Sequence, residues 1–226
     1  QVAGQDKRYA ALSQQLVGMR LPCLLGFEYL TQGIRVKGQW YPIVKMEWSK
    51  GEALHLYVER YLNDGQMLLS LAAQWRGLVN SLHGNGIAHG DLQHGNVLVT
   101  ANGKIELVDY DAMYVPALRG QQSPEIGHQN FQHPLRNADD FDESLDNFAA
   151  LLIYTSLRAL VIDPGLWRQY HTGENLIFSK PDFLAPRNSP VFRSLAGSPD
   201  NGVPLLAEAL MKCCLGPITQ VPALES

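Results

Sequence analysis

The sequence is poor in cysteine and contains no long hydrophobic run. Its three cysteines, Cys23, Cys213 and Cys214, provide neither an even set for disulfides nor the Cys-x-x-Cys spacing of a metal site. No apolar segment approaches the roughly 20 residues that span a bilayer, and the N-terminus lacks the pattern of a signal peptide. We therefore expect a soluble protein of the reducing cytoplasm with no membrane span.

Clusters of positive charge are also missing. The chain has 18 basic and 22 acidic residues and a net charge of −4, without a Lys/Arg run. Nucleic acids are bound largely by neutralising their phosphates, so we expect no nucleic-acid partner. The seven histidines show no His-Glu-x-x-His spacing. His89 and His94 flank Asp91 and the other five are scattered along the chain, which favours surface or core histidines over a zinc site.

The pattern of hydrophobic residues predicts a mixed α+β chain, beginning with a helix over residues 6–17. Two or three antiparallel strands are predicted over residues 24–48, with turns at Gln32-Gly33 and at residues 37–39. Residues 49–51 are interpreted as a connector. At 226 residues and 46% hydrophobic content, the chain can bury a sizeable core as one domain or as two lobes sharing a cleft.

The remainder is predicted to be mainly helical around one β-hairpin. Apolar residues recur there at three- and four-residue spacing, which is typical of a helix with one buried face. Strands over 96–99 and 104–108 flank an Ala-Asn-Gly turn. Helices are predicted over residues 54–61, 67–82, 145–161 and 204–215, and the proline-containing stretch 110–143 is predicted to be irregular.

Three polar residues around this hairpin form the strongest candidate site. Asp91 and Asn96 lie five positions apart in one loop, and Asp109 follows the second strand of the hairpin. The hairpin returns Asp109 towards that loop, so two carboxylates and an amide can face one cavity. Such a set suits phosphoryl transfer, which needs oxygen ligands for Mg²⁺ and a carboxylate for the attacking hydroxyl. Any one of these residues alone would be explained as well by a turn.

The same residues carry a resemblance to the protein-kinase superfamily. The run HGDLQHGNVLV resembles the kinase catalytic loop H-R-D-x-x-x-x-N, and VDYD resembles the D-F-G magnesium motif. The resemblance implies that Asp91 is the catalytic base and that Asn96 and Asp109 are Mg²⁺ ligands. It further implies that His89 supports the loop, and that Leu98 forms the apolar floor beneath the adenine of ATP.

Further segments extend this resemblance in kinase order. PIVKMEWSKG resembles the strand and hinge between kinase lobes, with Met46 as gatekeeper and the backbone of Glu47 and Ser49 at the adenine edge. GHQNFQHPL resembles the end of an activation segment. LDNFAALL resembles the next helix, whose acid, Asp146, would tie down the catalytic-loop backbone. Met46 could equally be a core methionine, and Asp146 an acid stabilised by the helix dipole.

The resemblance implies a bilobal α+β fold of the protein-kinase type. Residues 1–48 would be a partial, β-rich N-lobe, and residues 49–226 a helical C-lobe. Residues 1–26 contain no glycine-rich phosphate loop and no Val-Ala-Ile-Lys-like strand, so an active enzyme would need these parts upstream of Gln1. Gly90 stands in place of the usual arginine, and Gln93 where Ser/Thr kinases carry a lysine.

Three functions fit this pattern. The first is an atypical ATP- and Mg²⁺-dependent kinase that phosphorylates a protein Ser/Thr hydroxyl. The second is a pseudokinase that binds nucleotide or a regulatory protein partner without turnover, as the missing phosphate loop suggests. The third is a small-molecule phosphotransferase, because aminoglycoside and choline kinases share H-G-D-x-x-x-x-N with a later acidic pair, here Asp109 and Asp111. Its acceptor pocket would be formed by residues 113–142. The sequence specifies neither the acceptor nor the oligomeric state.

Overall fold

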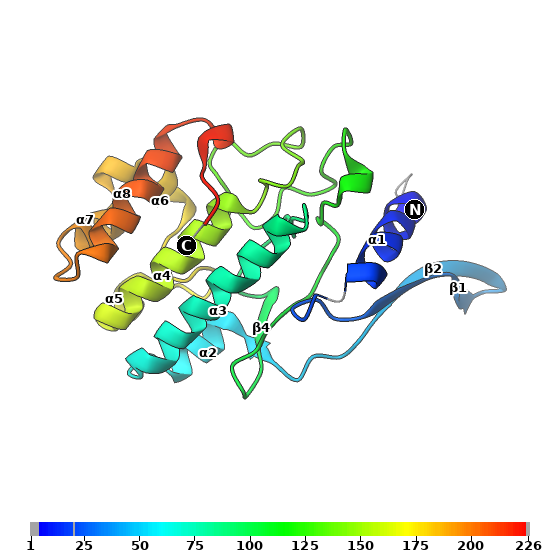
Figure 1. Ribbon diagram of the computed structural model, residues 1–226, viewed down its shortest axis with the longest axis horizontal. Helices are drawn as coiled ribbons and strands as arrows, with labels where there is room; N and C mark the ends of the chain where they lie inside the picture. The colour runs from blue at the N-terminus through cyan, green and yellow to red at the C-terminus, as the bar shows by residue number, and fades with distance from the viewer. Residues whose placement is uncertain (1–4, 20, 225–226) are drawn as a thin grey trace.

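The computed structural model describes residues 5–19 and 21–224 (Figure 1). It shows an α+β protein with small antiparallel sheets in the N-terminal part and a mainly helical C-terminal part. The chain begins with helix α1 (Gln5–Met19), as predicted. In the described part of the chain, no helix is both long and apolar enough to cross a membrane.

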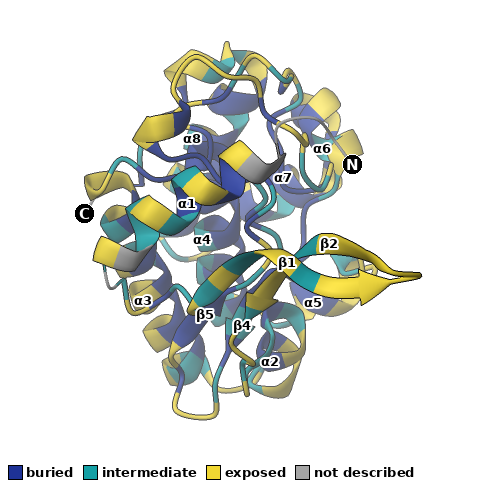
Figure 2. Cartoon of the chain, turned by 90° about the vertical axis from the view of Figure 1, so that its right-hand side faces the viewer, coloured by how far each residue is buried: buried dark blue, intermediate teal, exposed yellow. Residues whose placement is uncertain are grey.

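A two-stranded hairpin follows α1 and projects from the rest of the molecule (Figures 1 and 2). Strand β1 (Phe27–Val36) pairs antiparallel with β2 (Gln39–Met46), and the tight turn between them confirms the prediction at residues 37–39. The predicted turn at Gln32-Gly33 is wrong. Those residues lie in a bulge within β1, opposite Pro42, which has no N–H to donate to the ladder.

The second sheet has the order β3-β4-β5. Strands β4 (Val97–Val99) and β5 (Ile105–Leu107) form the predicted hairpin, and the short strand β3 (Glu52–Ala53) adds to the β4 edge. The segment before β1 joins this sheet, because Leu107 N donates to the Cys23 carbonyl at 2.8 Å. The segment before β1 and the β4–β5 hairpin, which follows the loop of Asp91 and Asn96, therefore belong to one hydrogen-bonded sheet.

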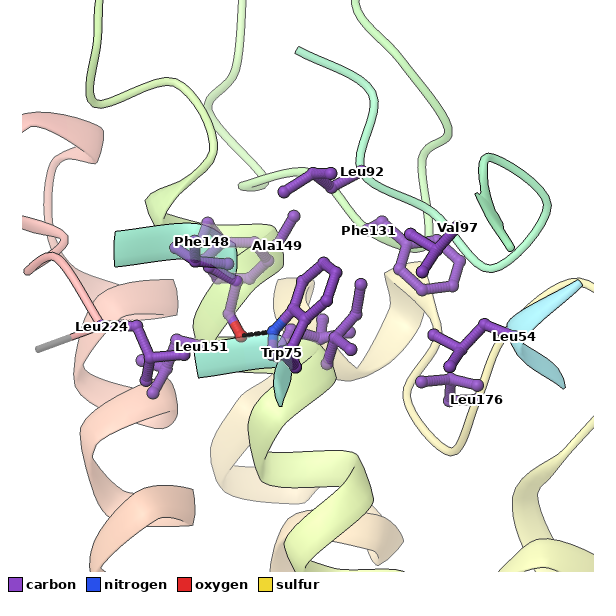
Figure 3. Close-up of a cluster of buried hydrophobic side chains, with 14 of the residues drawn as sticks. Leu54, Trp75, Leu92, Val97, Phe131, Phe148, Ala149, Leu151, Leu176 and Leu224 are labelled. Atoms are coloured by element: carbon purple, nitrogen blue, oxygen red, sulfur yellow. Dashed lines mark hydrogen bonds between the residues drawn. The ribbon is translucent and has the colours of Figure 1, made fainter. Parts of the chain in front are cut away.

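The core lies between the helices of the C-terminal part. Helices α3 (Gly65–Gly84) and α4 (Asn147–Ile162) pack against each other, and the buried indole of Trp75 donates to the Ala150 carbonyl at 3.0 Å (Figure 3). Helix α2 (Leu54–Arg60) and helix α8 (Gly202–Leu215) complete the set of four predicted helices. Each of these four was predicted to within two residues or so at either end.

Three short helices were not predicted from the sequence, where only one helix was expected after residue 161. They are α5 (Gly165–Tyr170), α6 (Lys180–Leu184) and α7 (Pro190–Ala196). Each is too short to show a helical period, yet two have readable start signals. At the start of α6, Ser179 N donates to the Asp182 carboxylate, and at the start of α7, Ser189 Oγ accepts from Phe192 N. Both helices also have a proline in their first turn.

The stretch 110–143 is irregular, as predicted, with a single 3₁₀ turn, η1 (Pro116–Leu118). It is nonetheless well packed, since Met113, Tyr114 and Phe131 are fully buried. Ala88 and Tyr114 exchange both of their backbone hydrogen bonds, at 3.1 and 2.7 Å. The segment is therefore a fixed part of the structure around the candidate loop.

Candidate functional site

Asp109 is placed beside the loop of Asp91 and Asn96 by the residue that precedes it. Val108 N donates to the Asn96 carbonyl at 3.0 Å. On its other side, His89 Nε2 lies 3.0 Å from the Val108 carbonyl oxygen. A carbonyl oxygen only accepts, so the His89 ring carries its proton on Nε2. Two backbone groups of one residue thus fix the end of the hairpin on the loop.

The backbone at the start of the loop is held by Asp146. Its carboxylate, in a side chain only 7% exposed, accepts from His89 N and, at 2.8 Å, from Gly90 N. It makes no cap bond to its own helix, α4. Burial raises the pKa of Asp146, against the opposing effects of His89, the two amides and Arg136. The side chain therefore makes the contact with the loop backbone that the kinase resemblance implies.

Gly90 is required by the shape of this loop. Its φ is +81°, and a Cβ at this position would collide with the carbonyl oxygen of Ala112. An arginine cannot occupy residue 90 without moving the segment after Asp109. The departure from the kinase pattern at this position thus has a conformational cause.

Asp91 is oriented by hydrogen bonds to both carboxylate oxygens. Asn96 Nδ2 donates to Oδ2 at 3.0 Å and to the Asp91 carbonyl at 3.0 Å, and His128 N donates to Oδ1 at 2.7 Å. Both protons of Asn96 Nδ2 are used in these bonds, and its Oδ1 accepts no hydrogen bond from the residues that the structure describes. A Cβ on Gly127 would lie 2.8 Å from Asp91 Oδ1, so only glycine permits this approach.

The donor from residue 128 was not expected from the sequence. A glycine within an otherwise polar segment is the signal that could have indicated a close backbone approach. Gln93 turns back into the loop, where its Oε1 accepts from Gly95 N at 3.0 Å. It therefore acts locally within the loop.

Glu125 lies close enough to Asp111, Asp109 and Asp91 for their charges to affect it. Burial raises the pKa of Glu125, and the negative charges of Asp111, Asp109 and Asp91 raise it further, while Arg8 opposes them. Asp109 itself is exposed and has φ +67°, an unusual backbone conformation for a residue with a side chain. Glu125 was not predicted to be near the site. Its position in an irregular segment gives no periodic signal that could have shown it.

The donor set fits Mg²⁺ bound together with phosphates. No group of three or more His, Cys, Asp or Glu side chains in residues 5–19 and 21–224 forms a metal site by itself. Mg²⁺ commonly uses only one or two carboxylates and completes its octahedron with phosphate and water oxygens. The exposed Asp109 carboxylate and the free Asn96 Oδ1 match that requirement, and a cation would relieve the repulsion among the acids.

The predicted adenine-side residues fall into two groups. Met46 and Glu47 line a cavity of about 280 Å³ together with Gly26, Phe27, Glu28 and Lys45. Ser49 and Leu98 are not in its lining. Ser49 Oγ donates to Glu106 at 2.8 Å, and Glu106 pairs with Leu98 across the second sheet. Met46 is half-buried and packs on the core, as expected of a core methionine, and its role as a gatekeeper stays a prediction.

Tyr110 contacts both the wall of this cavity and the loop that contains His89, and it was not singled out from the sequence. It is buried, and its hydroxyl accepts from Leu25 N at 2.7 Å and donates to the Leu107 carbonyl at 2.9 Å. Its ring meets those of His89 and Phe27 edge-on, with centroids 6.0 and 5.6 Å apart. The Tyr110 side chain thus reaches from His89, at the start of the loop of Asp91 and Asn96, to Phe27 in the wall of the cavity.

Three of the histidines that are scattered in the sequence, His55, His128 and His171, cluster with His94 in the structure. His94 lies within 4.7 Å of His55 and 6.0 Å of His128 between ring centroids, and His55 lies 6.3 Å from His171. The His94 ring donates from Nε2 to the Gly173 carbonyl at 3.0 Å. Its Nδ1 is buried and has no partner among the described residues. Burial, and then the neighbouring His55, lower the pKa of His94 to about 4.

The site therefore combines an oriented carboxylate, a free amide oxygen and an exposed carboxylate around one loop. Such an arrangement can orient a hydroxyl and hold a divalent cation on a phosphate. A comparison of the chain with known protein families and with curated proteins gives no match. The assignment of its chemistry therefore depends on the geometry described above.

Proposed function

We propose that this chain is an atypical kinase-like phosphotransferase that uses ATP and Mg²⁺ and transfers the γ-phosphate to a Ser/Thr hydroxyl of a protein. The observation that carries the proposal is the attachment of Val108 to both His89 and Asn96. This attachment of the residue before Asp109 to the loop of Asp91 and Asn96 supports a joint role of the three side chains in phosphoryl transfer. In this proposal the fold is bilobal, with residues 1–48 as the partial N-lobe and 49–226 as the C-lobe.

Asp91 is the proposed base. Its two oxygens are fixed by Asn96 and by His128 N, so the carboxylate has a defined direction and still has free lone pairs. As the acceptor hydroxyl oxygen bonds to the γ-phosphorus, Asp91 takes up its proton, and the bond from that phosphorus to the ADP oxygen breaks. Asp109 and Asn96 Oδ1 would hold Mg²⁺, which supplies neutralisation of the phosphate charge.

The nucleotide base is proposed to lie on the hinge side. The backbone of Glu47 and Ser49 would meet the adenine edge, Met46 would border its pocket, and Leu98 would lie beneath it. The cavity beside Met46 and Glu47 supports this placement. The acidic residues near Glu125 also support a requirement for a cation. Without a cation, the four carboxylates would repel the triphosphate of ATP.

Transfer of labelled γ-phosphate tests the proposal. The wild-type protein should phosphorylate itself or a general protein acceptor only with Mg²⁺. Asp91→Ala and Asp109→Ala should each lower the rate by about 100-fold or more, since each removes a group that acts in the transition state. Glu59→Ala, an exposed carboxylate on α2, is the matched control and should leave the rate unchanged. Equal rates in the wild type and in both site variants would contradict the assigned roles.

A regulatory module without turnover is the second candidate. It is favoured by the engagement of both Asp91 oxygens by protein groups, which leaves less freedom to receive a substrate hydroxyl. Calorimetry with Mg²⁺ and a non-hydrolysable ATP analogue separates the two functions. Tight binding of the analogue, with no transfer of phosphate from ATP to protein, would support a regulatory nucleotide-binding module. Transfer to a small hydroxylated compound in place of protein would support the third function, a small-molecule phosphotransferase.

A further inference from the structure

The first turns of α1 are attached to the segment that follows Asp109. Arg8 is buried, and its Nε donates to the Asp111 carbonyl at 3.0 Å, while its Nη2 donates to the Met113 carbonyl. Its guanidinium also lies 5.5 Å from the centre of the Phe141 ring. One side chain at the start of the chain thus holds two carbonyls about a hundred residues away.

The next residue of α1 makes a second attachment to the same turn. Tyr9 is buried, and its hydroxyl donates to the Asp111 carboxylate. Its ring stacks on Tyr29 of β1, with centroids 5.2 Å apart and planes at 10°. Tyr9 therefore contacts the projecting hairpin through its ring and the acidic turn through its hydroxyl.

The turn that these residues hold contains a backbone conformation that needs support. Asp109 has φ +67°, and residues with side chains keep such conformations only where their surroundings impose them. Val108 is fixed on one side by the loop, as described above. On the other side, Asp111 and Met113 are fixed by Arg8 and Tyr9. Asp109 therefore lies between two segments of backbone that are held in place, Val108 on one side and residues 111–113 on the other. Its own carboxylate is exposed.

The function of Asp111 follows from the same contacts. In the sequence, Asp109 and Asp111 resemble a pair of metal-binding acids. In the structure, the Asp111 carboxylate receives the Tyr9 hydroxyl and its carbonyl receives Arg8. Charge-assisted hydrogen bonds of this kind are stronger than neutral ones. Asp111 thus belongs to the anchor, and Asp109 is left as the acid that is free to bind a cation.

We propose that Arg8 and Tyr9 of α1 are positioning residues, which act through Asp111 and Met113 to aim the Asp109 carboxylate at the Mg²⁺ site. The inference rests on the proposed function for its reference to Mg²⁺. It adds that the docking of α1 sets the affinity of the site for the cation. Loss of the Arg8 and Tyr9 hydrogen bonds to this turn would therefore weaken Mg²⁺ binding, while the Tyr9 ring can stay on Tyr29 of the hairpin.

Hydrogen exchange without any ligand tests the anchor itself. Tyr9→Phe removes only the hydroxyl and keeps the ring on Tyr29. The amides of residues 109–113 should then exchange about ten-fold faster, the factor expected for loss of a hydrogen bond to a charged group. Lys7→Met, an exposed residue of the same helix turn, is the control and should leave those amides unchanged. Equal exchange in Tyr9→Phe and in the control would overturn the anchor.

A Mg²⁺ titration at fixed ATP tests the consequence for the site. Tyr9→Phe should raise the Mg²⁺ concentration for half-maximal nucleotide binding about ten-fold, with the affinity for ATP in EDTA unchanged. Arg8→Met should do the same or more, and Arg8→Lys should recover part of the loss because it retains the charge but lacks the fork of donors. An unchanged Mg²⁺ requirement in Tyr9→Phe, despite faster exchange at residues 109–113, would overturn the positioning role.

The two proposals fail in different ways. A wild-type protein that binds no Mg²⁺–ATP would refute the proposed function and the aiming of Asp109, while the exchange measurement would still decide whether α1 anchors the turn. A wild-type protein that binds Mg²⁺–ATP, with the same Mg²⁺ dependence in all α1 variants, would refute only the inference about Arg8 and Tyr9.

Discussion

The loop from His89 to Asn96 and the β1–β2 hairpin are neighbours that are held in different ways. The loop is fixed by buried hydrogen bonds to Asp146 and Val108, and its backbone has little freedom left. The hairpin is a two-stranded sheet that projects from the rest of the molecule, with Ile34, Trp40 and Tyr41 exposed. Isolated two-stranded sheets are marginally stable in water.

The difference indicates which half of the proposed site is already formed. The groups proposed to handle phosphate and cation belong to the fixed loop, and they need little rearrangement to act. Of the groups proposed to contact the nucleotide base, Met46 and Glu47 lie where β2 of the hairpin ends, and local opening costs less free energy there. Recognition of the base should therefore be more sensitive to conditions than the arrangement of Asp91, Asn96 and Asp109.

The largest expected effect compares one tryptophan in each region. Trp75→Ala should lower the free energy of unfolding by about 3–5 kcal/mol, because it leaves a large cavity in the core and removes the hydrogen bond from the indole to the Ala150 carbonyl. Trp40→Ala, at a side chain 51% exposed in the hairpin, should cost about 0.5 kcal/mol or less. Urea denaturation measures both. Similar losses would show that the hairpin is as tightly integrated as the core.

A smaller loss of unfolding free energy is expected at Asp146, whose carboxylate holds the backbone of the loop. Asp146→Ala removes the acceptor of two buried amides, His89 N and Gly90 N, and should cost about 2–4 kcal/mol of unfolding free energy. Phosphate transfer should fall as well, because the loop carries Asp91. Glu59→Ala serves as the control for a lost carboxylate. A variant with wild-type stability and activity would show that the loop holds its shape without this residue.

Acidification should weaken the loop region before the hairpin. Burial lowers the pKa of His94 to about 4, below the value of about 6.5 for an unfolded histidine. The unfolded chain therefore binds more protons between these values, and stability should fall as the pH drops from about 6.5 to 4. The slope from one such group is at most about 1.4 kcal/mol per pH unit.

Unfolding free energies measured across this pH range check the assignment. His94→Gln should flatten the slope, because glutamine does not titrate and can still donate towards the Gly173 carbonyl. His83→Gln, at an exposed histidine, should leave the slope as it is. His55 and His133, whose pKa values are also lowered by burial, would contribute the remaining slope with the same sign.

The smallest effect is expected at Trp48, which is 93% exposed between the proposed hinge residues Glu47 and Ser49. Trp48→Phe should change the unfolding free energy by no more than about 0.5 kcal/mol. It should, however, remove most of the change in tryptophan fluorescence that Mg²⁺–ATP produces. A full signal in this variant would place the nucleotide base away from the hinge.

The sequence was informative where periodicity or a motif extended over many residues. The helices around Trp75 and Ala150, the hairpin after Asn96 and the local order of Asp91, Asn96 and Asp109 all followed from it. The turn at Gln32-Gly33 was wrong because the effect of Pro42 depends on pairing across the sheet.

Other features depend on contacts that no local pattern encodes. Arg8 and Tyr9 meet Asp111 across about a hundred residues, and the charge of Glu125 reaches the site from an irregular segment. The four histidines come from α2, the loop and two later segments, so their spacing in sequence carries no sign of the cluster. Long-range packing alone determines these positions.

The bulge opposite Pro42 also affects how the protein should behave at high concentration. An exposed pair of strands with aromatic side chains is a template for further strands, and fibrils grow from such edges. In β1 and β2, however, regular pairing stops after Leu30 and resumes only at Ile34. Each uninterrupted ladder is thus only a few residues long, which protects the projecting hairpin from aggregation. Replacing Pro42 by a β-branched residue would be expected to promote fibril formation.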